Sequence, residues 1–253
     1  MQTDEYSGFF AEFYDILHAG NQDAKIYPRI LAPYGSKVLE LGCGTGRIAI
    51  PLAQAGFDVV GLEYSPAMIA LLEEKSYPKE HLRVFKGDAR DFSIGEAFDV
   101  ILLTCNFINH FQESGDILRI LHCCRQHLKD EGVVIIDCSA PDTKGMCESS
   151  GVEEMYKFKT PRGTVIKDYF CPHYDFLQQV ETDTIRLEEY DGETLVREAE
   201  ARETLTYYYP REIRELVREA GLRLVKESGR LWDGGHSIPI GQEESEMVFY
   251  CAR

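Results

Sequence analysis

Three alternating glycines stand beside a carboxylate early in the sequence, in the stretch VLELGCGTGR that begins at Val38. Gly42, Gly44 and Gly46 follow an apolar run and precede a helical pattern, a setting in which backbone N–H groups converge on a ligand. The G-x-G-x-G spacing matches neither the dinucleotide fingerprint G-x-G-x-x-G nor the G-K-[ST] of a phosphate-binding P-loop. Glu40 lies two positions before Gly42, where its charge disfavours a pyrophosphate and favours a ligand carrying an ammonium group.

Two further acidic residues follow the next two predicted strands. Glu63 ends the run DVVGLE, where a carboxylate can accept hydrogen bonds from both hydroxyls of a ribose. Asp88 follows the third predicted strand, LRVFKGD, where it can bind an exocyclic amine such as adenine N6. These acids and the glycine loop together predict a site for an adenosine that carries an amino-acid end rather than a phosphate chain.

One histidine is placed to remove a proton. His110 follows the fourth predicted strand, FDVILLT, and ligands gather at the carboxyl ends of strands in open α/β sheets. An ordinary histidine pKa of about 6.5 suits proton removal near neutral pH. We predict His110 as the general base for an acceptor that must lose a proton. The alternative is a ring that only caps the nearby helix or hydrogen-bonds in its loop.

The elements that must position these residues alternate between buried strands and helices. Strand patterns occur at KVLEL, DVVGLE, LRVFKGD, FDVILLT and GVVIIDC, and helical patterns include SPAMIALLEEK and residues 114–130. Two more strands, LRLVKES and EMVFYCA, follow near the end of the chain. The pattern predicts an α/β fold with a Rossmann-like, mostly parallel sheet of seven strands and helices on both faces.

The pattern changes near Met146 to long strands separated by turns at PRG and DGE. We therefore predict an N-terminal helical cap over 1–35, a core over 36–145 and 204–253, and an antiparallel β insert over 146–203. The insert is expected to act as a lid that excludes water from a substrate pocket, or to pair exposed strands in a homodimer.

Composition limits the classes of partner. The 253 residues carry a formal net charge of −16, with 44% hydrophobic and 28% charged residues, as in an ordinary soluble protein. This charge repels nucleic acid and anionic membrane surfaces, so neither is an expected partner. Because no signal peptide, membrane-spanning run or lipidation motif is recognisable, we expect a cytoplasmic protein.

The eight cysteines form no C-x-x-C pair, and the expected state is reduced thiols in the cytoplasm. Cys171 and His173 offer two metal ligands, but nothing nearby in the sequence completes a set. We therefore predict no metal site.

Five segments, ELGCGTGR, GLEYSPAMI, GDARDF, FDVILLTCNFINHF and GVVIIDC, occur in the order and spacing of a known family. The chain resembles class I S-adenosylmethionine-dependent methyltransferases over about 38–140 and again over 204–252. FAEFYDIL near the start and ETLTYYYPREIRELVREAGLRLVKE near the end are similar to small-molecule members of the glycine/sarcosine and amino-sugar N-methyltransferase type. The proline-rich NPPY-type motif of nucleic-acid amino methyltransferases is absent at TCNFINHF.

The resemblance implies S-adenosyl-L-methionine as the cofactor and assigns each motif residue a role. Glu40 and the loop backbone would hold the methionine end, and Glu63 would bind the ribose, where Asp is commoner in the family. Tyr64 and Met68 would flank the adenine, and Asp88 and Ala89 would contact its polar edge. Asn106 would face the methionine part or the acceptor.

Further candidates are expected on the acceptor side, of which the resemblance supplies only Tyr14. Tyr14 of the N-terminal cap would close over the methyl group, unless it is only a packed ring. Trp232 and His236, in the glycine-rich loop GRLWDGGHSIPIG, and His173 of the insert are predicted to border the acceptor pocket.

We predict transfer of a methyl group to a nitrogen or oxygen of a small molecule, with nitrogen slightly favoured. Two alternatives stay open: an RNA or protein methyltransferase, and a non-catalytic subunit that only binds S-adenosylmethionine.

Overall fold

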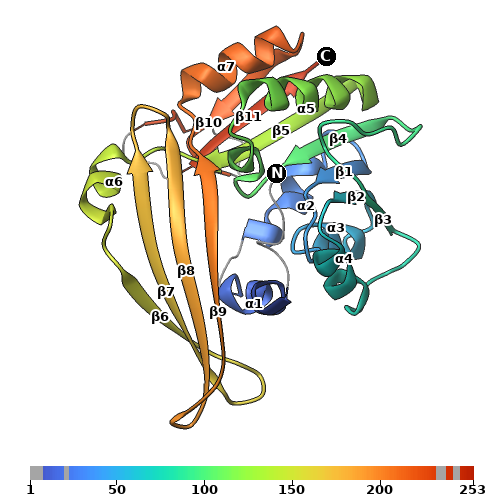
Figure 1. Cartoon of the computed structure of the whole chain (residues 1–253). Coiled ribbons are helices and arrows are strands. Elements are labelled where there is room, and N and C mark those ends of the chain that lie inside the picture. Colours follow the sequence, from blue (N-terminus) through green and yellow to red (C-terminus); the bar gives the residue numbers. More distant parts are fainter. Residues whose placement is uncertain (1–7, 20–22, 232–237, 242–245) are drawn as a thin grey trace.

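The computed structural model describes residues 8–19, 23–231, 238–241 and 246–253 (Figure 1). Its central sheet has the strand order β10-β11-β5-β4-β1-β2-β3, with β11 antiparallel to both neighbours and the other pairs parallel. The predicted mostly parallel sheet of seven strands is confirmed. The strands are β1 (Lys37–Leu41), β2 (Asp58–Glu63), β3 (Leu82–Lys86), β4 (Phe98–Leu103), β5 (Leu128–Ser139), β10 (Arg223–Ser228) and β11 (Glu246–Ala252).

Helices cover both faces of this sheet (Figure 1). Alternating strand residues build two apolar clusters, so that Leu39 packs with α5 and α7 while its neighbour Val38 packs with α2, α3 and α4. The helical elements of the core are η1 (Asp23–Lys25), α2 (Tyr27–Leu31), α3 (Ala49–Gln54), α4 (Pro66–Glu73), η2 (Phe107–His110), α5 (Ser114–His127) and α7 (Pro210–Glu219).

Helix α5 is shorter than the predicted 114–130. It ends at His127, and β5 begins at the next residue, Leu128. Leu128 pairs in register with Phe98 of β4, and both side chains are buried. Burial of this strand pair therefore outweighs the helical pattern at the end of the segment.

The residues between β5 and α7 form a second, four-stranded antiparallel sheet, which we call the insert. Helix α6 (Thr143–Ser149) leads into β6 (Glu154–Lys159), β7 (Val165–Asp175), β8 (Val180–Asp191) and β9 (Thr194–Thr206), which pair in sequence order. The PRG and DGE turns join β6 to β7 and β8 to β9, as predicted.

Helix α1 (Gly8–Leu17) lies between the insert and the central sheet (Figure 1). Phe13 of α1 packs against Ile166 of β7 and Leu187 of β8, both fully buried. The face of the insert that carries Ile166 and Leu187 therefore points toward the core, and we call it the inner face. The apolar contact fixes α1 between the two sheets.

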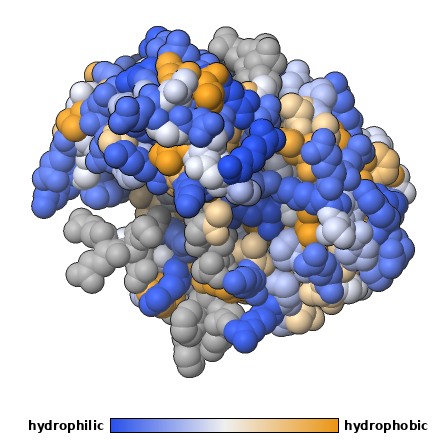
Figure 2. All heavy atoms as spheres, turned by 90° about the horizontal axis from the view of Figure 1, so that it is seen from below, coloured by the Kyte–Doolittle hydropathy of each residue, from blue (hydrophilic) through white to orange (hydrophobic). Residues whose placement is uncertain are grey.

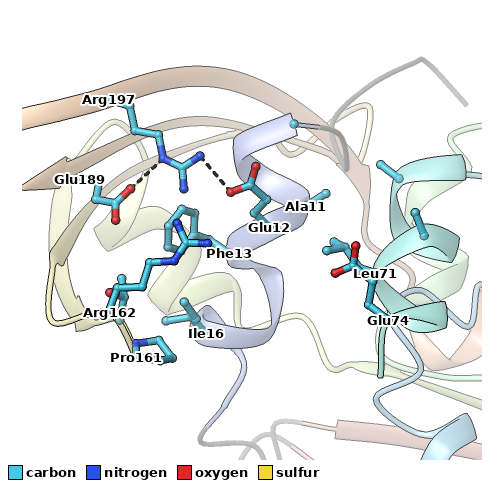
Figure 3. Close-up of a pocket in the computed structure, with 14 residues that line it drawn as sticks. Ala11, Glu12, Phe13, Ile16, Leu71, Glu74, Pro161, Arg162, Glu189 and Arg197 are labelled. Atoms are coloured by element: carbon cyan, nitrogen blue, oxygen red, sulfur yellow. Dashed lines mark hydrogen bonds and ion pairs between the residues drawn. The ribbon is translucent and has the colours of Figure 1, made fainter. Parts of the chain in front are cut away.

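An ion-pair network beside this contact also joins α1 to the insert (Figure 3). The guanidinium of Arg197 in β9 lies 2.9 Å from Glu12 of α1 and 2.7 Å from Glu189 of β8. These residues line a cavity of about 800 Å³ that also contacts α4 and the turn between β6 and β7. Arg162 extends into it from that turn, and Glu74, the residue that follows α4, borders it (Figure 3).

The surface seen in Figure 2 is mostly hydrophilic, and hydrophobic residues lie scattered over it. Among the helices in the described part of the chain, none combines the length and apolar character needed to cross a bilayer. All eight cysteines are free thiols.

We expect Phe13→Ala to lower the free energy of unfolding by about 3 kcal/mol, because the truncation leaves a cavity between α1 and the insert. Chemical denaturation measures this loss. Leu177→Ala is the matched control, since Leu177 is 92% exposed and its truncation should leave stability unchanged. Equal stability of the two variants would show that α1 is not docked as described.

Candidate functional site

The glycine loop leaves β1 through left-handed backbone, with φ of +70° at Gly42, +52° at Gly44 and +83° at Gly46. A Cβ at Gly42 would collide with the ring of Phe107, and one at Gly46 would collide with Ile50. At Gly44, in contrast, no atom lies within 4 Å of the Cβ position. The first and third glycines are thus required by packing, while the absence of a side chain at Gly44 leaves open space for a ligand beside the loop.

Glu40 in β1 carries the charge of the site in a buried position. The residue is 3% exposed, and its Oε2 has no hydrogen-bond partner among the described residues. Burial raises the pKa of Glu40 to about 8, a rise that Arg47 opposes and Glu63 increases. A buried carboxyl with an unsatisfied oxygen is stabilised by a cationic donor. Glu40 and the open space beside Gly44 therefore fit the ammonium end of S-adenosylmethionine.

The carboxylate of Glu63 ties the glycine loop to the start of α4. It accepts hydrogen bonds from the backbone N–H groups of Gly44 at 2.8 Å, Tyr64 at 2.8 Å and Ser65 at 2.7 Å. A carboxylate has about four acceptor positions, and three are occupied. This arrangement leaves room for one ribose hydroxyl, whereas the sequence predicted two.

The residues predicted around the adenine lie at the ends of β2 and β3, which are neighbours in the sheet. Met68 and Ala89 are buried, whereas Tyr64 is 44% exposed. Asp88 is already engaged by Arg90, whose guanidinium lies 2.6 Å from its Oδ2 and lowers the pKa of Asp88. The position of Asp88 suits its predicted role, but its carboxylate is shared with this arginine.

The turn after β4 is strained. Cys105 and Asn106 adopt φ of 59° and 62°, a left-handed conformation that non-glycine residues rarely occupy. The Oδ1 of Asn106 accepts a hydrogen bond from the N–H of Ser139 at 2.6 Å, which holds the turn against the end of β5. Strained backbone of this kind is common at functional sites. Here the strained turn places Asn106 and η2 at the carboxyl edge of the sheet.

A cavity of about 320 Å³ opens at this edge, between α1, the turn after β4, the end of β5 and β9. It brings together three of the predicted residues, Tyr14, Asn106 and His110. Its lining residues are Tyr14, His18, Arg47, Cys105, Asn106, His110, Asp137, Cys138, Ser139, Glu203, Leu205 and Glu246. Arg47 links this cavity, called here the acceptor cavity, to the glycine loop.

Tyr14 extends from α1 into the acceptor cavity and stacks on His18, with ring centroids 4.3 Å apart. Burial raises the pKa of Tyr14 to about 12, although Arg47 opposes the rise. The phenol therefore stays protonated at neutral pH. Tyr14 can donate or accept a hydrogen bond, but it is not a base.

The position of Tyr14 depends on anchors that the sequence did not reveal. Asp15, the next residue of α1, accepts a hydrogen bond from Thr45 of the glycine loop at 2.5 Å. Lys75 lies 2.5 Å from the other oxygen of Asp15 and donates to the carbonyl of Thr45 at 2.8 Å. These contacts hold α1 against the glycine loop.

The imidazole of His110 lies beside a carboxylate of the insert, with Nδ1 3.5 Å from Oε1 of Glu203. Burial lowers the pKa of His110 to about 4, because the charged ring is disfavoured away from water. The expected pKa near 6.5 is therefore wrong. The ring is neutral at pH 7, where it can accept a hydrogen bond but holds a proton only weakly.

Of the other predicted acceptor residues, His173 is described by the structure and does not line the cavity. His173 is exposed on β7 and pairs in register with Thr182, on the face opposite to the inner one. Trp232 and His236 lie outside the described residues. Within the described ranges, no group of three or more His, Cys, Asp and Glu side chains is arranged to hold a metal ion.

Comparison with known proteins identifies the domain. A family model described as a methyltransferase domain matches residues 38–132. The dTDP-3-amino-3,6-dideoxy-alpha-D-glucopyranose N,N-dimethyltransferase of Streptomyces fradiae is 30% identical over 141 residues, 53% of this chain and 54% of the relative. The glycine/sarcosine N-methyltransferase of Aphanothece halophytica is 31% identical over 141 residues, 53% of each chain. The chain thus spans about half the length of these curated relatives.

A solved structure extends the likeness to the whole chain. SAM-bound CalS10, an amino pentose methyltransferase from Micromonospora echinaspora involved in calicheamicin biosynthesis, has a TM-score of 0.72 at 22% identity and covers 99% of each chain. The fold is that of the S-adenosylmethionine-dependent methyltransferases. Residues 38–132 match the methyltransferase domain model, and the resemblance predicted from the sequence is confirmed.

We expect Gly44→Val to weaken binding of S-adenosylmethionine at least about 100-fold, because the side chain would occupy the open cradle and strain the backbone. Isothermal titration calorimetry measures the affinity. Gly192→Val is the matched control, since Gly192 has a similar φ of +60° and open surroundings in the β8–β9 turn. Equal affinities of the two variants would refute the loop assignment.

We also expect binding of S-adenosylmethionine to release close to one proton at pH 7. With a pKa of about 8, Glu40 is mostly protonated in the free protein, and a bound cation favours its carboxylate. The affinity should therefore rise between pH 6 and pH 7.5. Calorimetry in buffers of different ionisation enthalpy counts the protons. An unchanged count in Glu40→Gln would assign the release to another group.

Proposed function

We propose that this chain transfers the methyl group of S-adenosylmethionine to an amine nitrogen of a small molecule. The observation that carries this proposal is that the glycine loop and the acceptor cavity adjoin each other. The glycine loop, with the unsatisfied carboxyl of Glu40, suits the methyl donor, and the acceptor cavity adjoins it through Arg47. Donor and acceptor would thus meet at one edge of the sheet.

The size of the acceptor cavity supports a small acceptor. Its volume of about 320 Å³ is at the lower end of the range for small-molecule sites. Nitrogen is favoured over oxygen because the curated relatives are named as N-methyltransferases, one for a nucleotide-linked amino sugar and one for glycine and sarcosine. The net charge of −16 also disfavours nucleic acid and anionic membrane surfaces as partners.

When bound, S-adenosylmethionine would supply a methyl group already activated by its sulfonium. The task of the protein is therefore mainly alignment, which can lower a barrier by about 7–11 kcal/mol in favourable cases. Glu40 and the loop would fix the donor, while Tyr14 and Asn106 would border the acceptor. An acceptor amine must also be unprotonated when it reacts, and the neutral ring of His110 can accept a hydrogen bond from its N–H.

The proposal is tested by supplying isotope-labelled methyl donor and metabolite extracts to the protein and identifying the compound that gains label. A labelled small molecule is the expected result. Label found only in RNA or protein would favour a macromolecular acceptor. Donor binding without any transfer would favour a non-catalytic subunit and overturn the proposal.

We expect His110→Ala to slow methyl transfer by about 100-fold, because the neutral ring would accept the hydrogen bond that orients the acceptor amine. The donor affinity should not change, because His110 lies on the acceptor side of the site. His122→Ala, an exposed histidine of α5, is the control and should behave as the wild type. Turnover of His110→Ala at the wild-type rate would remove His110 from the mechanism.

A further inference from the structure

The inner face of the insert ends in three carboxyl groups beside the acceptor cavity. Asp183 of β8 pairs directly with Glu203 of β9, and Glu181 pairs with Leu205, so these side chains share one face. Glu203 and Leu205 both line the cavity. Like charges directly opposite each other destabilise a pair of strands. The fold therefore retains this arrangement only with a compensating proton or cation.

One of these carboxyls has an unsatisfied oxygen. Asp183 is 3% exposed, and its Oδ1 has no hydrogen-bond partner among the described residues. Glu181 is different, because its Oε1 accepts a hydrogen bond from Tyr174 at 2.8 Å. Burial raises the pKa of Asp183 to about 8, and the charges of Glu181 and Glu203 add to the rise. The cluster thus favours a group that brings positive charge and N–H donors.

The other walls of the acceptor cavity also carry acidic side chains. Asp137 of β5 and Glu246 of β11 line it together with Glu203, whereas Arg47 is the one arginine or lysine among its described lining residues. The facing ring of His110 is neutral at pH 7, because its pKa is lowered to about 4. An anionic acceptor would be repelled by these carboxylates, and a cation would be attracted.

We propose that the acceptor enters as a cationic amine and that its ammonium group is bound by Glu203, with Asp183 directly beside it on the inner face. This inference rests on the proposed function and specifies its substrate class. Hydrogen bonds from an ammonium to a carboxylate are charge-assisted and strong, so they select a basic amine over an alcohol, an amide or a carboxylate.

The same contact prepares the nitrogen for reaction. One proton passes from the ammonium to the carboxylate of Glu203, which leaves a neutral amine with a free electron pair and a neutral carboxylic acid. No electrons are gained or lost. A neutral pair is favoured over an ion pair where water is excluded, so burial of the cluster promotes this transfer. Glu203 later releases the proton to water.

The first test examines the substrate class. Metabolite extracts are treated with an amine-selective acetylating reagent, or left untreated, and then incubated with the wild-type protein and labelled methyl donor. We expect label in a small molecule from the untreated extract and a loss of at least about 100-fold after acetylation, since removing one partner of a buried charged pair is costly. Undiminished label after acetylation would overturn the inference while leaving methyl transfer established.

The second test examines the residue. Glu203→Gln should lower transfer to the untreated extract by at least about 100-fold and leave donor affinity in calorimetry unchanged. Glu200→Gln is the control, because Glu200 is exposed on the other face of the same strand. Wild-type transfer by Glu203→Gln would overturn the inference. Wild-type protein that binds the donor but labels nothing would refute the proposed function, and the inference would fail with it.

Discussion

The chemistry of this protein depends on carboxyl groups held away from water at one edge of a sheet. A buried carboxyl must keep a proton or find a cationic partner, because an isolated ion in a low dielectric is unstable. Glu40 and Asp183 both have an oxygen without a partner among the described residues, and burial raises the pKa of each to about 8. One lies in the central sheet and the other in the insert, so the two carboxyls are placed for different ligand groups.

The rest of the structure maintains this geometry. The glycine loop turns the chain at the sheet edge after β1 by adopting positive φ angles. Cys105 and Asn106 turn the chain after β4 in the same way. Helix α1 fills the space between the two sheets, and its two faces contact different parts of the structure. Tyr14 and His18 line the acceptor cavity, whereas Glu12 and Ile16, about half a turn away, contact the insert side. The carboxyl groups at this edge are thereby enclosed between the two sheets.

The sequence was sufficient for features governed by local pattern. Buried strands, the turns of the insert and the glycine loop could be predicted, because each depends on apolar periodicity or on residues with special backbone freedom. Glu203 and Asp183 could not, since only the register between β8 and β9 brings them together beside η2. The same limit explains the error in the pKa of His110, because burial by distant segments cannot be seen in a local motif. His173 was misplaced for a related reason: strand parity decides its face, and neighbouring positions point in opposite directions.

The carboxylates that line the acceptor cavity from the central sheet bear on the direction of charge movement during the reaction. Methyl transfer to an amine moves positive charge from the donor's sulfur to the acceptor's nitrogen, so a fixed anion on the acceptor side interacts more strongly with the transition state than with the bound reactants. Only such differential interactions accelerate a reaction. A carboxylate such as Asp137, held in place by a hydrogen bond from Tyr27 at 2.8 Å, needs no rearrangement to act in this way. On the proposed function, the acidic cavity would therefore select a basic amine and also favour its alkylation.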